Sequence, residues 1–310
     1  MARIFVTRKL PGDAVERLAA DHEVEIWEED RPIERAELLR RAAGATGLLC
    51  TLVDRVDADL LDALPDLRAI ANYAVGVDNI DLAAAAQRDV AVGNTPDVLT
   101  ETTADLTFAL ILACARGLLP AAADVRAGRW TTWSPQGWLG RDVHGATLGI
   151  VGAGAIGRAV ARRAGGFGMS VLFNGRRPQE GHVPLEELLA GSDFVSLHPP
   201  LTGETRGLIG ERELRAMKPT AVLVNTARGP IVDAVALRRA LEEGWIAAAG
   251  LDVTDPEPLP ADDPLLDAPN LIVLPHIGSA SHATREAMAR LAVENLRAAM
   301  AGRPMPHPAA

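Results

Sequence analysis

The stretch TLGIVGAGAIGRAVARRAGGFGMSVLFN, residues 147–174, joins an apolar strand, a glycine-rich turn, a helix and a second apolar strand. Its turn, GAGAIG, fits the pattern GxGxxG. Gly152 permits a tight turn, Gly154 lets backbone N–H groups approach a pyrophosphate, and Gly157 lets the helix pack on the strand. The helix N-terminus then presents unpaired N–H donors to the anion. A turn without a ligand is the alternative, but the complete context favours a dinucleotide-binding βαβ unit.

Short apolar runs alternate with helical stretches on both sides of this unit. Five runs in the first hundred residues are typical of buried parallel strands: ARIFVT, HEVEIW, TGLLCT, LRAIANYA and VAVGNT. Helical spacing separates them at 12–20, 33–43 and 58–64, and a second alternation begins at Gly145. We therefore predict an α/β protein with two Rossmann/flavodoxin-like, doubly wound parallel-sheet domains and a cleft between them.

One of the two predicted domains is discontinuous. Residues 1–97 plus 282–310 are expected to form the substrate-binding (catalytic) domain, and residues 98–281 the dinucleotide-binding Rossmann domain. A long helix beginning at Thr100 or Thr102 opens the second domain, and an amphipathic helix from Ser281 returns the chain to the first. The Pro-rich end, GRPMPHPAA, is expected to be loose.

Composition excludes several classes of protein. The 310 residues include 31 Lys and Arg against 41 Asp and Glu, a net charge of −10, which disfavours a general nucleic-acid binder. The apolar stretch near the start, IFV, is too short for a signal peptide, so none is expected, and no apolar run is long enough to span a membrane. Cys50 and Cys114 lie in apolar contexts without metal-ligand spacing, so no disulfide framework and no metal site is predicted. A cytoplasmic protein is expected.

The end of the second strand of the βαβ unit bears on the choice of cofactor. An acidic residue that binds the ribose 2′-hydroxyl is expected there, but the sequence has Asn174, then Gly175, Arg176 and Arg177. An amide with two guanidinium groups would bind a 2′-phosphate, which a carboxylate would repel. The sequence therefore favours NADP(H) over NAD(H). NAD(H) stays possible because both arginines could simply be solvated loop residues.

Three later strands are each followed by one ionisable residue. Arg228 follows a buried strand, Glu257 lies in a Pro-rich loop after the next strand, and His276 follows the last strand. Ligands of open α/β sheets bind beyond the carboxyl ends of the strands, so the three could meet in one crevice. Together they suit hydride transfer to a 2-oxo acid: the histidine donates the proton, the carboxylate orients it, and the guanidinium holds the substrate carboxylate.

These residues carry a resemblance to a known family. From about residue 45 to 305 the chain resembles the D-isomer-specific 2-hydroxyacid dehydrogenases. The segments that carry it are NYAVGVDNID, NTPDVLTETTADLTFALILACAR, TLGIVGAGAIGRAVARR, LVNTARGPIVD, AAAGLDVTDPEPLP and LPHIGSASHATREAMA. Within the family it is most similar to the glyoxylate/hydroxypyruvate reductases. The resemblance implies NADPH-dependent reduction of glyoxylate or hydroxypyruvate to glycolate or D-glycerate.

The resemblance also assigns roles to residues of this chain. It implies that His276 is the proton donor, Glu257 its partner and Arg228 the carboxylate clamp. Further positions match family sites: the backbone at Val75 and Gly76 for the substrate carboxylate, Leu52 facing the substrate, Thr103, Thr226, Asp252 and Gly278 near the nicotinamide, Ala155 and Ile156 at the pyrophosphate, and Pro200 near the adenine ribose. The segment after Arg177 is shorter than usual, and the residues around Leu52 are apolar and do not discriminate among small 2-oxo acids.

Three of the five tryptophans lie within nine positions, at Trp130, Trp133 and Trp138. Tryptophan is favoured at interfaces and in pockets. The loop could instead plug the protein's own core. The resemblance implies that Trp138 reaches the active site of a neighbouring subunit, and hence a homodimer formed through the nucleotide-binding domain and this loop.

Two alternative functions stay open. The chain could be a broad-specificity or NADH-dependent D-2-hydroxyacid dehydrogenase. It could also be a nucleotide-sensing, corepressor-like binding protein, although Arg228, Glu257 and His276 weigh against a role without catalysis. Most other histidines have no partner pattern, but His198 borders the cofactor side.

Overall fold

The computed structural model describes residues 1–176 and 179–309. The chain divides into two compact units. Unit 1 comprises Met1–Leu99 and Ser279–Ala310, and unit 2 comprises Thr100–Gly278. Both are parallel-sheet α/β units, which confirms the predicted fold class.

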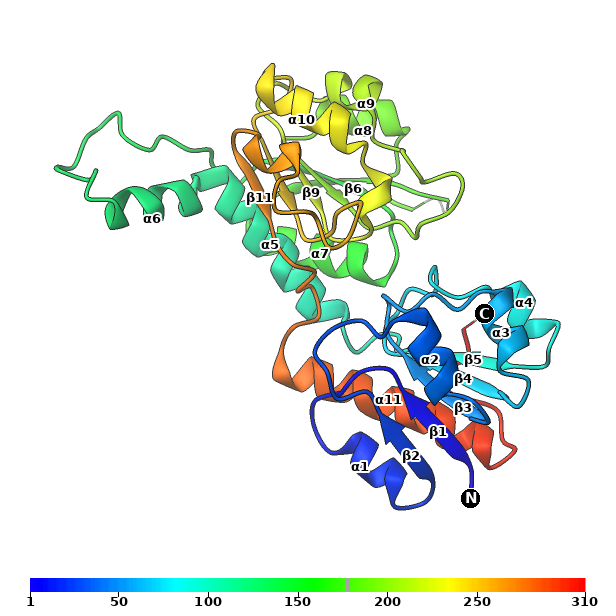
Figure 1. Cartoon of the computed structure of the whole chain (residues 1–310). Coiled ribbons are helices and arrows are strands. Elements are labelled where there is room, and N and C mark those ends of the chain that lie inside the picture. The colour runs from blue at the N-terminus through cyan, green and yellow to red at the C-terminus, as the bar shows by residue number, and fades with distance from the viewer. Residues whose placement is uncertain (177–178, 310) are drawn as a thin grey trace. The chain divides into compact units, whose positions relative to one another are not determined.

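Unit 1 contains a five-stranded parallel sheet of order β2-β1-β3-β4-β5, the doubly wound order of flavodoxin-like sheets (Figure 1). Its strands are β1 (Arg3–Val6), β2 (Glu23–Ile26), β3 (Gly47–Cys50), β4 (Ala69–Asn72) and β5 (Ala91–Gly93). Its helices are α1 (Ala14–Ala19), α2 (Arg35–Arg41), α3 (Ala58–Ala63), α4 (Leu82–Ala86) and α11 (His282–Met300). Each of the five apolar runs expected to form strands does so.

Helices cover both faces of this sheet. Helix α11 packs on β3, β4 and β5 and against α1, while α2, α3 and α4 contribute to a core on the other face. That core includes Leu48 and Ile70 from the sheet with Leu38 and Leu60 from the helices, all at most 3% exposed. A parallel sheet buried on both faces explains why its strands read as continuous apolar runs.

The C-terminal tail is ordered along β5, so the expectation of a loose Pro-rich end was wrong. Ala309 N donates to Val92 O at 2.8 Å, and Asn94 N donates to His307 O at 3.1 Å. Met305 is only 7% exposed. β5 is an edge strand whose free backbone groups need partners, and the tail supplies them despite its prolines.

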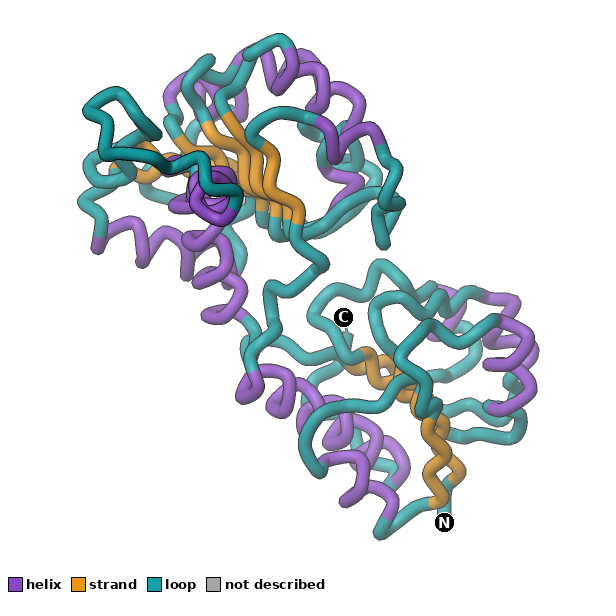
Figure 2. Tube along the Cα trace, turned by 60° about the vertical axis from the view of Figure 1, so that its left-hand side comes forward, coloured by secondary structure: helices purple, strands orange, loops and turns teal. Residues whose placement is uncertain are grey.

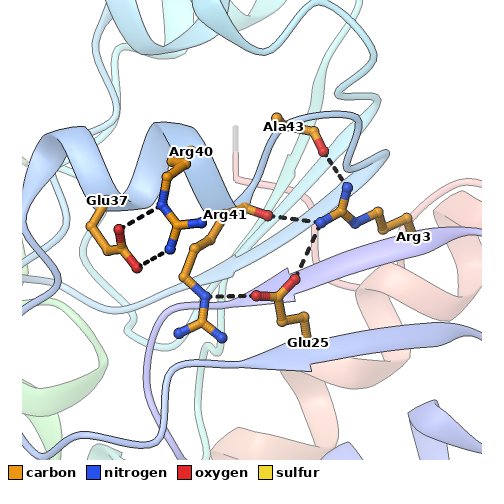
Figure 3. Close-up of polar contacts among 6 residues, drawn as sticks. All are labelled: Arg3, Glu25, Glu37, Arg40, Arg41 and Ala43. Atoms are coloured by element: carbon orange, nitrogen blue, oxygen red, sulfur yellow. Dashed lines mark hydrogen bonds and ion pairs between the residues drawn. The ribbon is translucent and has the colours of Figure 1, made fainter.

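An ion-pair network ties β1, β2 and α2 together at the surface of unit 1 (Figure 3). Glu25 accepts from Arg41 Nε at 2.6 Å and from Arg3 Nη2 at 3.2 Å. Burial by itself would raise the pKa of Glu25, but the hydrogen bonds from Arg41 and Arg3 outweigh it and lower that pKa. The network is partly exposed, so we assign it to the orientation of α2 and not to a large share of stability.

Unit 2 contains a six-stranded parallel sheet of order β11-β10-β9-β8-β6-β7. Its strands are β6 (Thr147–Val151), β7 (Ser170–Asn174), β8 (Phe194–Leu197), β9 (Val222–Asn225), β10 (Ala248–Leu251) and β11 (Leu271–Val273). Its helices are α5 (Thr100–Arg116), α6 (Leu118–Arg126), α7 (Ala155–Gly166), α8 (Leu185–Gly191), α9 (Glu211–Ala216) and α10 (Ala234–Glu242), with 3₁₀ turns at Gly229–Ile231 and Pro264–Asp267. The strand order reverses between β6 and β8, which is where such sheets bind ligands.

Helices cover both faces of the sheet of unit 2 (Figure 2), and a hydrophobic core lies between the helices and each face. Helices α5 and α7 pack on one face, and α8, α9 and α10 contribute to the core on the other. Phe108 of α5 stacks on Phe167 at 5.2 Å between ring centroids. The ionisable residues predicted for the site follow strands of this sheet, whose two faces are both packed against helices.

Helix α5 continues into α6 after a break at Gly117 and a bend of 63°. Among the described residues no single helix is long and apolar enough to cross a membrane, and only this bent pair has the length and composition to do so. Eight residues of α5 are buried within the protein, and a helix buried in a protein core can be as apolar as a membrane span.

Candidate active site

The glycine-rich turn connects β6 to α7 with a different constraint at each glycine. Gly152 has φ +97°, a backbone conformation that disfavours side chains, and a Cβ there would lie 2.5 Å from the backbone of His198 and Pro199. A Cβ on Gly157 would overlap the Gly152 carbonyl oxygen, whereas a Cβ on Gly154 would meet nothing within 4 Å. Gly154 thus faces open space at the N-terminus of α7, so an anion has room to reach the N–H groups of Ala155 and the residues after it.

A half-buried histidine lies at the end of the neighbouring strand. His198 follows β8, and its Nε2 is 2.8 Å from Ser196 Oγ. Its Nδ1 is buried and has no hydrogen-bond partner among the described residues. Burial lowers the pKa of His198 to about 3, so the ring is neutral. The histidine lies beside the glycine-rich turn, because a Cβ on Gly152 would lie 2.5 Å from the His198 backbone. This is the side of the unit where the dinucleotide is expected.

The end of β7 is the segment expected to select the cofactor. Asn174 Nδ2 donates to Val183 O at 3.1 Å, which leaves its second N–H and its oxygen for other partners. Arg176 is exposed, and Arg177 lies outside the described residues. Pro200, expected near the adenine ribose, is exposed after β8. The remaining polar groups of Asn174 and the exposed Arg176 are thus available to a ligand at the end of β7.

His276 and Glu257 form a direct pair. His276 Nδ1 and Glu257 Oε1 are 2.5 Å apart, and the two side chains are 23% and 30% exposed. Glu257 lies in the loop after β10, and His276 follows β11 with φ +53°. Because Nδ1 is engaged by the carboxylate, Nε2 is the ring nitrogen left for a substrate. This pairing has the geometry of an oriented acid–base histidine.

Asp252 holds the loop that carries His276. Its two carboxylate oxygens accept from Ile277 N and Gly278 N, each at 2.7 Å, and its own carbonyl accepts from His276 N at 2.9 Å. The residue is 1% exposed. Burial raises the pKa of Asp252, against which the two backbone N–H groups and the charge of His276 act. Asp252 thus accepts three backbone hydrogen bonds, from His276, Ile277 and Gly278, and these fix the backbone of the histidine loop.

Arg228 is placed by a buried amide that the sequence interpretation missed. Asn225, at the end of β9 and fully buried, accepts from Ala227 N at 3.0 Å and donates to Arg228 O at 2.8 Å. A Cβ on Gly229 would overlap the Thr254 carbonyl, so the turn after Arg228 packs directly on the loop that leads to Glu257. The signal was available: an asparagine ends the buried strand VLVN, where a side-chain amide must find partners.

The residues assigned to the nicotinamide end lie together. Thr107 Oγ1 donates to Thr103 O at 2.9 Å and lies 3.0 Å from Thr226 Oγ1. A Cβ on Gly278 would come within 3.4 Å of Thr103 Cγ2 and 3.1 Å of Asp252 Oδ2. These contacts join helix α5 to the ends of β9 and β11. Thr103, Thr226, Asp252 and Gly278 therefore form one cluster beside the His276 loop.

The residues expected to face the substrate belong to unit 1. Val75 is 37% exposed, and Gly76 and Leu52 are half-buried, in the loops that follow β4 and β3. Both loops lie at the carboxyl end of the unit 1 sheet. That these residues meet His276 and Arg228 around one substrate stays a prediction.

The tryptophan-rich loop does not plug the core. Trp130, Trp133 and Trp138 are 64%, 78% and 49% exposed, and no residue of α6 is buried. Figure 1 shows α6 and this loop extending from the rest of unit 2. We call residues 118–141 the arm. Its exposed apolar side chains argue against the interpretation as a cover for the protein's own core.

In the described parts of the chain, no three His, Cys, Asp or Glu side chains are grouped so that they could hold a metal ion. The two cysteines have pKa values raised by burial, that of Cys114 to about 12, so neither is a ready thiolate.

Comparison with known proteins identifies the family of the chain. The family model for the D-isomer specific 2-hydroxyacid dehydrogenase, NAD binding domain, matches residues 108–278. A glyoxylate reductase of Korarchaeum cryptofilum is 50% identical over 303 residues, covering 95% of this chain and 91% of the relative. The crystal structure of the TT0316 protein from Thermus thermophilus is 51% identical with a TM-score of 0.95, covering 99% of this chain and 100% of that one. The NADPH-dependent glyoxylate/hydroxypyruvate reductase of Sinorhizobium meliloti, in complex with NADP and malonate, is 36% identical with a TM-score of 0.88, covering 100% and 97%.

Proposed function

The chain belongs to the D-isomer specific 2-hydroxyacid dehydrogenase family, and on that premise we propose that it reduces glyoxylate and hydroxypyruvate to glycolate and D-glycerate with NADPH. The observation that carries the proposal is the 2.5 Å pair of His276 and Glu257 on the loops after β11 and β10. The names of the Korarchaeum and Sinorhizobium relatives support the substrate class.

His276 acts as the proton donor in this proposal. Glu257 holds Nδ1, so Nε2 of the protonated ring faces the carbonyl oxygen of the substrate and gives it a proton. When bound, the reduced dinucleotide supplies the hydride that reaches the carbonyl carbon. The carboxylate of Glu257 stabilises the charged imidazolium before the transfer and orients the neutral ring after it. Asp252 keeps the loop in place throughout through its bonds to Ile277 and Gly278.

Arg228 binds the substrate carboxylate and polarises the adjacent carbonyl. A guanidinium matches a carboxylate with two parallel hydrogen bonds, which also fixes the direction of the 2-oxo group. Asn225 sets the backbone from which the arginine projects. The N–H groups of Val75 and Gly76 complete the carboxylate site in this proposal.

Residues at the GxGxxG turn and at the end of β7 support a dinucleotide. The open space at Gly154 and the free N-terminus of α7 fit a pyrophosphate. Asn174 and the exposed Arg176 favour a 2′-phosphate, and hence NADPH. The NADP in the Sinorhizobium relative agrees with this preference.

The deciding experiment compares NADPH and NADH as cofactors with a panel of small 2-oxo acids that includes glyoxylate and hydroxypyruvate. We expect the highest kcat/KM with NADPH and these two substrates. Arg176→Ala should lower the NADPH preference, whereas Arg212→Ala, a matched change at a 91% exposed side chain on α9, should not. A higher kcat/KM with NADH would refute the cofactor assignment. No glyoxylate-dependent oxidation of NADPH would refute the enzyme and favour a nucleotide-sensing role.

The arm supports a homodimer. Leu118, Leu119 and Val125 of α6 are 52%, 49% and 55% exposed, and Trp133 and Leu139 of the loop are each 78% exposed. A second copy that covers this surface would remove it from water, and Trp138 would then reach the neighbouring active site. Sedimentation of the wild type and of Trp133→Ser with Leu139→Ser tests this. We expect a dimer that the double change weakens, and a monomeric wild type would contradict it.

A further inference from the structure

The loop expected to bind the substrate carboxylate is anchored from one side by hydrogen bonds to its carbonyl groups. Ala74 O accepts from Thr95 N at 2.9 Å, and Val75 O accepts from Asn94 Nδ2 at 2.8 Å. In a trans peptide the carbonyl of one residue and the N–H of the next point in opposite directions. The N–H groups of Val75 and Gly76 therefore point away from the segment that holds the two carbonyls.

Those two N–H groups are available to a ligand. Neither has a hydrogen-bond partner within residues 1–176 and 179–309. Consecutive N–H groups directed to one side form a concave site that binds anions. The direction of the Val75 and Gly76 N–H groups therefore agrees with their binding the substrate carboxylate. This inference rests on the proposed function.

Asn94 is itself held from the far side of unit 1. Its carbonyl accepts from Asn295 Nδ2 of α11 at 3.0 Å, and its N–H donates to His307 O of the tail at 3.1 Å. Asn295 is fully buried, and its Oδ1 accepts from His307 N at 2.9 Å. A Cβ on Gly93 would lie 2.6 Å from Asn295 Nδ2, so the strand and the helix are already in close contact. Asn94 thus links a rigid buried element to the exposed loop.

A second amide holds the next peptide of the loop. Asn72 Nδ2, at the end of β4, donates to Gly76 O at 2.8 Å and to Asn79 Oδ1 at 3.0 Å. Asn79 Nδ2 in turn donates to Thr51 O at 3.1 Å. The loop that carries Leu52 is therefore tied to the same network. Of these amides, only Asn94 fixes the peptide whose N–H belongs to Gly76.

We propose that Asn94 is a positioning residue for the substrate: its side-chain amide fixes the Val75–Gly76 peptide and so aims a backbone N–H at the substrate carboxylate. The residue contacts the loop and not the reacting atoms. Its loss should therefore weaken carboxylate binding and leave the cofactor site and the proton donor, both in unit 2, unchanged. Replacing Asn94 by alanine removes one hydrogen-bond donor to the loop and no charge.

Asn94→Ala tests this assignment. We expect KM for glyoxylate and the inhibition constant of oxamate, an unreactive analogue that carries the same carboxylate, to rise together by about tenfold, the equivalent of about 1.4 kcal/mol. The values of kcat and of the KM for NADPH should change by less than about twofold. Asn94→Ser, whose hydroxyl is too short to reach Val75 O, is the second variant if the alanine variant does not fold.

Thr46→Val is the matched control, because it removes another side-chain hydrogen bond to a carbonyl of unit 1, Thr46 Oγ1 to Arg3 O at 3.1 Å. It should lower the melting temperature as much as Asn94→Ala does while leaving KM and oxamate inhibition unchanged. Unchanged oxamate inhibition in Asn94→Ala would overturn the proposal, as would a parallel loss of kcat and NADPH affinity. If the wild type does not reduce glyoxylate, the proposed function fails, and titration of oxamate into both NADPH-loaded proteins still decides the role of Asn94.

Discussion

Alanine at Gly154 should weaken cofactor binding and alanine at Gly157 should weaken folding, although only two residues separate the two positions. At Gly154 the added methyl group meets no atom within 4 Å, and φ is −73°, which any residue adopts. The only expected cost to folding is the weaker helix cap, at most about 1 kcal/mol. The same methyl group lies where a pyrophosphate must approach the N–H groups of α7. We expect NADPH affinity to fall about 10- to 100-fold, or about 1.4–2.8 kcal/mol.

At Gly157 the added methyl group overlaps the backbone carbonyl of Gly152 and lies 3.1 Å from Ile150 Cγ2. A carbonyl in a tight turn cannot move as a flexible side chain does, so the helix must shift from the strand. Overpacking costs about 1–3 kcal/mol, against which alanine gains up to about 1 kcal/mol of helix propensity. Because the overlap is with a backbone atom, we place the cost at about 3 kcal/mol and expect Gly157→Ala to lose about 2 kcal/mol of stability after the gain in helix propensity.

Two independent assays separate the outcomes. Urea unfolding reports the free energy of unfolding, and fluorescence titration with NADPH reports the dissociation constant at a temperature where both variants are folded. Gly154→Ala should change mainly the dissociation constant of NADPH, and Gly157→Ala should change the free energy of unfolding. If Gly154→Ala binds NADPH as tightly as the wild type, no pyrophosphate contacts this turn. If Gly157→Ala is as stable as the wild type, the close packing of α7 on β6 does not constrain the turn.

Three further predictions concern histidines and the arginine. His276→Ala should lower kcat at least about 100-fold, and near-wild-type turnover in a steady-state assay would remove His276 from the mechanism. Arg228→Ala should raise KM for glyoxylate and lower kcat, together about 100-fold or more in kcat/KM, with Arg228→Lys between it and the wild type; unchanged constants would contradict the carboxylate clamp. The pKa of His198 is lowered to about 3 in the folded protein, so between about pH 6.5 and 3 only the unfolded chain takes up a proton at this residue. The folded state therefore has its full stability above about pH 6.5 and loses stability as the pH falls toward 3. At pH 5 the free energy of unfolding should be lower by about 2 kcal/mol. Urea unfolding should show this loss in the wild type and in the control His144→Gln, at an exposed position, but not in His198→Gln.

Local pattern accounts for much of the fold. The alternation of apolar runs and helical spacing predicted the strands of both sheets, because parallel strands buried on both faces have a distinctive composition. The C-terminal tail differs from what its composition predicts. Its prolines suggested a loose end, but an edge strand with unpaired backbone groups offered partners that only the folded unit 1 presents.

The candidate site divides in the same way. The sequence alone determined the glycine turn and the identity of Arg228, Glu257 and His276, because a turn before a helix and an ionisable residue after a buried strand are local features. Only the tertiary structure decided how those groups are held. Asn94 is anchored by Asn295, 201 residues further along the chain, and the His276 loop by a carboxylate 25 residues before it. Such partners are chosen by which buried polar groups become neighbours once the sheets and helices have packed, and no spacing in the sequence records that choice.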